Sequence, residues 1–168
     1  MILVIICLVV TLALAGTYSV ANPIIIQNQQ KSADEARQEV APDGDGFTQY
    51  DGKLAEGVED CYIADKAGTP VTAGYKGFGG TVKVMIGIDA DGKVTGVKVT
   101  EHSETPGLGT KAADPEYLKQ YKGVAEAPEA SIKDDKNVDA VTGATITSNA
   151  VYNSVERSFS SVQGMRRC

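Results

Sequence analysis

The amino-terminal stretch constrains this chain most, because no charged side chain occurs before Lys31. Its first 26 residues, MILVIICLVVTLALAGTYSVANPIII, are apolar almost throughout. A helix needs about 20 predominantly apolar residues to cross the hydrocarbon core of a bilayer, and residues 2–21 supply them before Pro23 interrupts the pattern. We therefore predict a single transmembrane anchor over residues 1–26.

A cleavable signal peptide is the alternative interpretation of this stretch. Ala13-Leu14-Ala15 and Ser19-Val20-Ala21 both resemble cleavage sites between small residues. A signal peptide usually opens with a positively charged region, which is missing here, and the apolar run resumes at residues 24–26. The sequence therefore favours a retained anchor that contacts membrane lipid. Because no Lys or Arg precedes it, its orientation is only weakly encoded.

Charge and cysteine content exclude several classes of partner and site. The 16 basic and 22 acidic residues all follow the anchor, so the remaining chain is acidic. Such a surface is unsuited to phosphate backbones, and we expect no nucleic-acid partner. Cys7, Cys61 and Cys168 show no metal-ligand spacing, and we expect no metal site. Cys61 is interpreted as a small buried residue, and a disulfide between Cys61 and Cys168 stays open.

The pattern of the remaining chain predicts a linker followed by strands. Residues 27–54 are polar, with the turn-forming cluster APDGDG, and indicate a linker or short helix. From residue 55 onward the pattern is that of one domain. Two short runs flank Lys66-Ala67-Gly68, which indicates a hairpin. Alternating valines and isoleucines on both sides of Asp91-Gly92 indicate a second hairpin.

Helices follow the strands. In DPEYLKQYKG, Asp114 before Pro115 and the closing Gly123 delimit a short helix. Residues 131–141 are compatible with a strand or a loop. From about Ser148 the helical spacing returns and predicts a carboxy-terminal helix with one apolar stripe. Without any alternation of parallel strands and helices, the predicted fold class for residues 55–168 is α+β, an antiparallel sheet with flanking helices.

Conventional catalytic arrangements are scarce in this sequence. His102 is the only histidine, which excludes multi-histidine metal sites, and a solvated or structural role is favoured over that of a general base. The acidic pairs Glu59-Asp60 and Asp134-Asp135 are interpreted as solvated surface. No phosphate-binding loop, dinucleotide fingerprint or nucleophile elbow is present. Any chemistry must come from other stretches.

Two stretches contain more special residues than plain loops need. HSETPGLGT, residues 102–110, combines a proline that fixes φ with glycines that let backbone approach a ligand closely; as plain structure it is a turn. VDAVTGATITSNAV, residues 138–151, places hydroxyls before the predicted helix, and as plain structure it is an N-cap in which Thr147 or Ser148 binds first-turn amides. The same amides and the helix dipole also favour an anion such as phosphate.

The segment DAVTGAT, Asp139 to Thr145, resembles the DxxTGAT signature at which a flavin transferase links FMN to the last threonine through a phosphoester. Thr142 in place of serine is within the pattern of that family. With GYKGFGG at residues 74–80 and the ETPGLG loop, the chain resembles the FMN-binding domain of the G subunits of the Rnf complex. The related C subunits of sodium-translocating NADH:quinone reductase share this fold, but the short chain favours the Rnf family.

The resemblance extends over roughly residues 55–165, and it assigns roles to individual residues. It implies that Thr145 carries FMN covalently, and that Thr147 and Ser148 offer hydrogen bonds near the phosphate. It also implies that the flavin transferase recognises Asp139, Thr142, Gly143 and Ala144. The small residues Gly143 and Ala144 would in addition leave space for the phosphate. The residues implied to line the flavin are Glu104, Thr105, Leu108 and Gly109, with Lys111 as a cationic neighbour. Tyr75 and Phe78 either cover a flavin face or belong to the core.

The resemblance also implies a function. The chain would be an electron-transfer subunit of a membrane-bound translocase that couples ferredoxin:NAD+ oxidoreduction to Na+ or H+ movement, and FMN, not side chains, would supply the redox chemistry. No residue of this chain is then catalytic. The implied partners are the other Rnf subunits, A, B, C, D and E, and the flavin transferase during maturation. The domain would lie on the extracytoplasmic side of the inner or plasma membrane, behind a single-pass anchor.

Two alternative functions are compatible with the sequence. One is a flavin electron shuttle outside the cytoplasm, either free-standing or similar to the quinone reductase's C-type FMN protein. The other is a non-redox, membrane-anchored binding module in which the threonine-rich segment only caps a helix. Loss or retention of flavin after substitution of Thr145 distinguishes the second alternative from the flavoprotein hypotheses.

Overall fold

The computed structural model describes residues 1–168 except 43, 45, 53, 64–67, 126–130, 134, 167 and 168. The chain forms two compact units, Met1–Glu35 and Ala36–Cys168. The first unit is helical, and the second contains a sheet with helices. Each is described by itself below.

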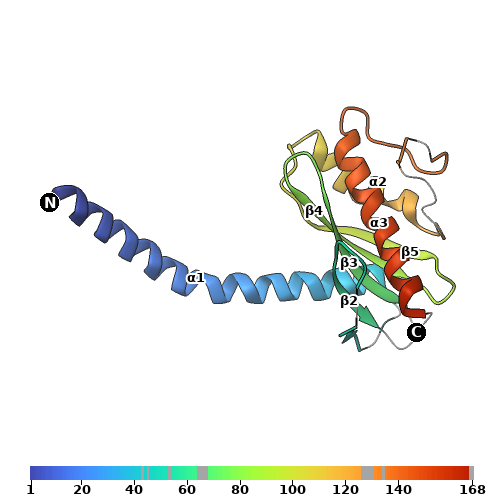
Figure 1. Cartoon of the computed structure of the whole chain (residues 1–168), viewed down its shortest axis with the longest axis horizontal. Helices are drawn as coiled ribbons and strands as arrows, with labels where there is room; N and C mark the ends of the chain where they lie inside the picture. Colours follow the sequence, from blue (N-terminus) through green and yellow to red (C-terminus); the bar gives the residue numbers. More distant parts are fainter. Residues whose placement is uncertain are drawn as a thin grey trace. The chain divides into compact units, whose positions relative to one another are not determined.

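Helix α1 runs from Ile2 to Val40 without interruption, and Figure 1 shows it as one continuous helix with a bend. It is the one helix of the described chain that is long and apolar enough to cross a membrane. Pro23 lies inside this helix. A proline removes one backbone hydrogen bond, and a long helix can tolerate that loss by kinking. Of residues 27–54, for which the sequence left a linker or a short helix open, residues 27–40 continue α1.

Five antiparallel strands form a sheet in which every strand pairs with its neighbours in the sequence, in the order β1-β2-β3-β4-β5. The strands are β1 Thr48–Gln49, β2 Val58–Ile63, β3 Thr69–Lys76, β4 Thr81–Ile88 and β5 Val94–Glu101. Both predicted hairpins are confirmed as the pairs β2–β3 and β4–β5. The second turns at Gly92, whose φ of 83° is in the left-handed region that glycine favours. Most of the first turn, residues 64–67, lies outside the described residues.

Among the described residues, the helical segments after the sheet are the 3₁₀ turns η1 Gly109–Ala113 and η2 Lys119–Tyr121, and the helices α2 Pro115–Leu118 and α3 Thr145–Arg166. Helix α2 begins as predicted, because the Asp114 carboxylate accepts a hydrogen bond of 3.0 Å from the Glu116 amide. The described residues of 131–141 form a loop. The predicted antiparallel α+β class is thus confirmed.

The main core lies between one face of the sheet and α3, which crosses the sheet in Figure 1. Side chains alternate along a strand, so Val84 and Ile86 of β4 pack with Val155 of α3 in one buried cluster. The residue between them, Met85, belongs to a second cluster with Ala36 and Val40. The last turn of α1 therefore covers the opposite face of β4.

This last turn of α1 is held by backbone and side-chain contacts. The Thr95 hydroxyl of β5 donates to the Val40 carbonyl, and the Lys98 ammonium lies 2.6 Å from the Glu39 carboxylate. Gly87 permits the close approach, because a Cβ at that position would collide with the Val40 carbonyl oxygen. The second compact unit starts at Ala36 and so includes this turn of α1, whereas the FMN-binding domain expected from the sequence begins at residue 55.

Candidate functional site

Helix α3 begins at Thr145, three residues before the position that its apolar spacing suggested. The Ala144 carbonyl accepts the first helical bond from the Ser148 amide at 2.9 Å, so Ala144 is the N-cap residue. Alanine offers no side-chain acceptor for the first turn. Thr147 and Ser148 consequently lie within the first turn, and the N-cap role that the sequence suggested for them is wrong.

The amides of residues 145–147 find no hydrogen-bond acceptor within the described part of the chain. Unpaired first-turn amides and the positive end of a long helix dipole together favour an anion. The start of α3 therefore has the electrostatic character of a phosphate site, with the Thr145 hydroxyl beside it.

The segment before α3 is held in place by hydrogen bonds to its backbone. The Gln120 side-chain amide binds Asp139 twice, accepting from its N–H at 2.9 Å and donating to its carbonyl at 3.3 Å. The Val141 N–H donates to the Ser148 hydroxyl at 3.0 Å. Gly143 then takes a φ of 83°, a value for which glycine has no steric cost. Ser148, which is fully buried, thus supports the segment.

The second motif follows β5 and leads into η1. Here the Gly107 N–H donates to the Thr110 hydroxyl at 2.9 Å, and Gly107 has a φ of 77°. This turn brings Leu108 and Gly109 back toward the start of α3. The two stretches that the sequence singled out therefore meet in space, although they are far apart in the chain.

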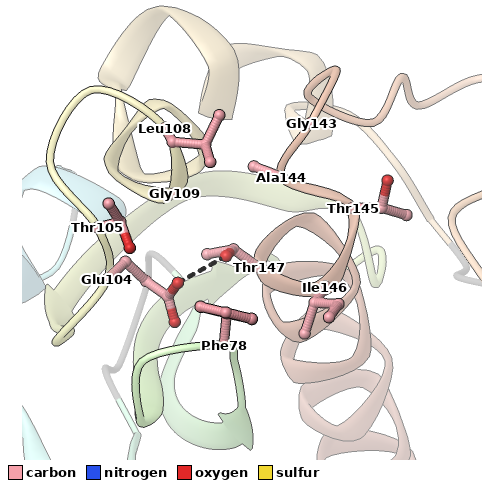
Figure 2. Close-up of a pocket in the computed structure, with 10 residues that line it drawn as sticks. All are labelled: Phe78, Glu104, Thr105, Leu108, Gly109, Gly143, Ala144, Thr145, Ile146 and Thr147. Carbon is pink, nitrogen blue, oxygen red and sulfur yellow. Dashed lines mark hydrogen bonds between the residues drawn. The ribbon is translucent and has the colours of Figure 1, made fainter.

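Between them lies a cavity of about 360 Å³, which Figure 2 shows with its lining side chains. Its lining residues are Phe78, Glu104, Thr105, Leu108, Gly109, Gly143, Ala144, Thr145, Ile146 and Thr147. Three apolar side chains on the rim are unusually exposed for their size: Phe78 at 73%, Ile146 at 54% and Leu108 at 45%. The volume lies within the range of roughly 300–1,000 Å³ that is typical of small-molecule sites.

A buried carboxylate links the walls of this cavity. Glu104 accepts a hydrogen bond of 2.8 Å from the Thr147 hydroxyl and one of 3.1 Å from the Gly79 amide. A Cβ at Gly109 would come within 2.7 Å of the same carboxylate, so a glycine is needed there for the loop to pass. Figure 2 shows the hydrogen-bonded side chains of Glu104 and Thr147 at the centre of the site, and the Thr145 side chain pointing away from them.

Eight residues from the sequence-based set line the cavity: Glu104, Thr105, Leu108, Gly109, Gly143, Ala144, Thr145 and Thr147. Phe78, one of the two aromatic candidates, also lines it. Four members of the set do not line it: Ser148, Lys111, Asp139 and Thr142. Of these, Lys111, Asp139 and Thr142 are exposed and available to a partner. The sequence reasoning missed Ile146, whose only signal was an apolar residue between two threonines.

Tyr75 lines a neighbouring, more open cavity of about 590 Å³ together with Lys76, Ile146 and Arg157. The Arg157 guanidinium lies 4.7 Å from the centre of the Tyr75 ring, which is the geometry of a cation–π contact. Ile146 is common to the two cavities. Tyr75 therefore lies beside the main site and not in its wall.

The two remaining candidate residues contribute no chemistry to the cavity. His102 is exposed, and its Nδ1 accepts from the Glu104 N–H at 3.4 Å. Cys61 is buried against α3, with its sulfur 3.7 Å from that of Met165. Burial, with a smaller contribution from Asp60, raises the pKa of the Cys61 thiol to about 11. A Cys61–Cys168 disulfide cannot be placed, because Cys168 lies outside the described residues.

The lining of the cavity suits FMN. The open amides at the start of α3 match its phosphate, and exposed Phe78, Leu108 and Ile146 offer apolar surface to a flat aromatic ring. Thr145, the first residue of α3, lines the same cavity.

Comparison with known proteins agrees with this fit. The sequence profile of the FMN-binding domain family matches residues 77–160, which is half of the chain. That matched segment contains every residue that lines the main cavity.

Two relatives align over nearly the whole chain. The G subunit of the proton-translocating ferredoxin:NAD(+) oxidoreductase complex of Clostridium ljungdahlii is 31% identical over 95% of this chain and 88% of its own length. The G subunit of the Na(+)-translocating complex of Acetobacterium woodii is 33% identical over 99% of this chain and 91% of its own length. The match to the G subunit of the ion-translocating oxidoreductase complex of Pectobacterium atrosepticum, at 40% identity, covers 58% of this chain and 52% of that protein.

Among solved structures, the C subunit of the Na(+)-translocating NADH-quinone reductase of Parabacteroides distasonis is similar to this chain with a TM-score of 0.55. The match covers 84% of this chain and 94% of the other at 17% identity, which supports a shared fold. The profile match and the two near full-length relatives show more than a fold: the chain belongs to the FMN-binding domain family and, within it, to the G subunits of ion-translocating ferredoxin:NAD+ oxidoreductase complexes.

Proposed function

We propose that this chain is a covalently flavinylated electron relay in an Rnf-type complex, with FMN joined through a phosphoester to the Thr145 hydroxyl. The observation that carries the proposal is the position of Thr145. It opens α3 at the rim of a cavity made by both motif segments, next to three unpaired first-turn amides. A hydroxyl at that position can be esterified without displacing any hydrogen bond found for it among the described residues.

The chain's own residues bind, cover and position the cofactor. The first-turn amides bind the phosphate oxygens, while Leu108, Phe78 and Ile146 shield part of the ring from water. Bound FMN would supply the one- and two-electron chemistry. No side-chain acid or base is required for this function, which agrees with the absence of a catalytic constellation from the sequence.

The proposed setting is the extracytoplasmic face of the inner or plasma membrane. The apolar part of α1 anchors the chain, and the A, B, C, D and E subunits of the complex are its redox and structural partners. The coupled ion is Na+ or H+, because the two near full-length relatives belong to complexes named for each. Covalent attachment retains FMN on a domain that no cytoplasmic flavin pool can resupply. Exposed Asp139 and Thr142 present the attachment segment to the flavin transferase.

The first prediction concerns the attachment residue. When the chain is produced with a flavin transferase and a supply of FAD, its denatured wild-type band should fluoresce in a gel. Thr145→Ala should abolish that fluorescence, because the phosphate loses its only attachment oxygen. Ser160→Ala, which removes an exposed hydroxyl from the same helix, is the matched control and should retain the full signal.

Mass spectrometry of the peptide that contains residue 145 gives the site directly. A wild-type peptide with the added mass of FMN less water supports the proposal. A colourless wild-type chain, or equal fluorescence in Thr145→Ala and Ser160→Ala, contradicts it and favours the non-redox binding module.

A further inference from the structure

We propose that Glu104 is a positioning residue that holds a fixed negative charge in the wall of the flavin cavity and makes the bound flavin harder to reduce. The inference rests on the proposed function, because it requires FMN in this cavity. Beyond the attachment of FMN at Thr145, it names Glu104 as a residue of this chain that sets the flavin's redox potential.

Glu104 is unusual in its burial. It is the one charged side chain among the buried residues of the described chain, with 7% of its surface exposed. No cation pairs with it among the described residues, since the ion pairs found there involve other carboxylates. A buried charge without a counter-ion is costly and is retained only when hydrogen bonds stabilise it.

Two donors supply those hydrogen bonds. The Thr147 hydroxyl donates to one carboxylate oxygen at 2.8 Å, and the Gly79 amide donates to the other at 3.1 Å. Because both oxygens accept, the arrangement suits the charged carboxylate. The donors come from the turn between β3 and β4 and from the first turn of α3, so the carboxylate fixes three separate segments at one point.

Glycines bring these segments together around the charge. A Cβ at Gly77 would collide with one carboxylate oxygen, and a Cβ at Gly109 would lie 2.7 Å from the other. Backbone from two segments therefore lies close against the Glu104 carboxylate, and Glu104 itself lines the cavity. A flavin bound in this cavity would lie beside the carboxylate, and water cannot fully screen a charge that is only 7% exposed.

The electrostatic consequence follows from the electron count of the cofactor. The oxidised flavin ring is neutral, and two electrons with one proton at N5 leave the reduced ring with one negative charge. The electrons come from a one-electron redox centre of a partner subunit, or from a chemical reductant in the experiment. A fixed negative charge in the same cavity opposes this change, so Glu104 lowers the reduction potential. A low flavin potential suits a relay inside a complex whose electrons start from ferredoxin, a low-potential donor.

The test is a potentiometric titration of the full, flavinylated chain in detergent. Glu104→Gln removes the charge with little change of shape, and it should raise the flavin's midpoint potential. A tenfold gain in preference for the reduced form corresponds to about 30 mV for a two-electron couple, and we expect a shift of at least that size. Glu116→Gln is the matched control, because that carboxylate is exposed at 79% and pairs with Lys119 at the surface; it should leave the potential unchanged.

A second variant keeps the inference testable if the Glu104→Gln protein does not fold. Thr147→Val keeps the charge and the shape but removes one hydrogen-bond donor, so the less stabilised carboxylate should lower the midpoint potential. An unchanged potential in a folded Glu104→Gln protein overturns the inference, as does a potential in Thr147→Val that stays the same or rises. A wild-type chain without denaturation-resistant flavin contradicts the proposed function itself, whereas a yellow wild type with an unresponsive Glu104→Gln contradicts only the role of Glu104.

Discussion

Three hydroxyl side chains in the first turn of α3 have three different surroundings. Thr145 projects from the rim of the cavity, Thr147 donates to Glu104, and Ser148 accepts from the Val141 amide. The sequence placed all three near a phosphate, but only Thr145 has a hydroxyl without a hydrogen-bond partner among the described residues. Their separate roles follow from the helical rotation of about 100° per residue, which points neighbouring side chains in different directions.

The Cys61 side chain should not react with thiol reagents in the folded protein. Its pKa of about 11 keeps the thiol neutral at pH 8, and the thiolate is the reactive form. Iodoacetamide at pH 8 should therefore leave Cys61 unmodified in the native chain and alkylate it after denaturation, as peptide mass spectrometry can measure. Equal modification in both states would contradict its burial and its raised pKa.

Among the elements, the last turn of α1 and the start of α3 depart most from their sequence patterns. The polar residues 31–40 lack the apolar stripe of a core helix, yet Ala36 and Val40 of their final turn pack with Met85 of β4, and the Val40 carbonyl accepts from Thr95 of β5. Helix α3 begins at an alanine N-cap, which carries none of the usual capping signals. In both cases contacts with residues distant in sequence fix the boundary.

Two glycine substitutions test this packing of elements. Gly87→Ala should lower the free energy of unfolding by about 1–3 kcal/mol, because the added methyl group would collide with the Val40 carbonyl. Gly164→Ala, in α3 with open space around it, should instead raise it by about 0.5 kcal/mol through its better helix propensity. Urea denaturation of residues 31–168, which contain the whole second unit, measures both values. A neutral Gly87→Ala would show that the α1 turn does not lie on the sheet.

On the scale of the whole molecule, the apolar part of α1 and the flavin domain have separate tasks. The first unit exposes its apolar side chains, as expected for a segment whose solvent is lipid. The second unit contains the entire cavity. Membrane attachment and cofactor binding can therefore be tested separately.

The corresponding prediction concerns the native protein in its membrane. The chain should remain in the membrane fraction through washes with high salt, and its intact mass should match the uncleaved sequence plus one FMN less one water. Mild detergent should co-extract it with the other subunits of an Rnf-type complex. A chain shortened to a terminus after Ala15 or Ala21 would favour the signal peptide, and purification without partner subunits would favour the free-standing shuttle.

The sequence by itself determined the features that depend on local chemistry. The uncharged apolar run required a membrane-type helix, period-two alternation predicted the hairpins, and Asp114 with Pro115 located a short helix. The flavin attachment at Thr145 comes from the family resemblance and stays a prediction. Only the tertiary structure decided where α1 ends, where α3 begins and what surrounds Glu104. These outcomes depend on close approaches between segments far apart in the chain, at Val40 with Gly87 and at Glu104 with Thr147 and Gly79. No local pattern encodes them, because their energies come from partners that folding brings together.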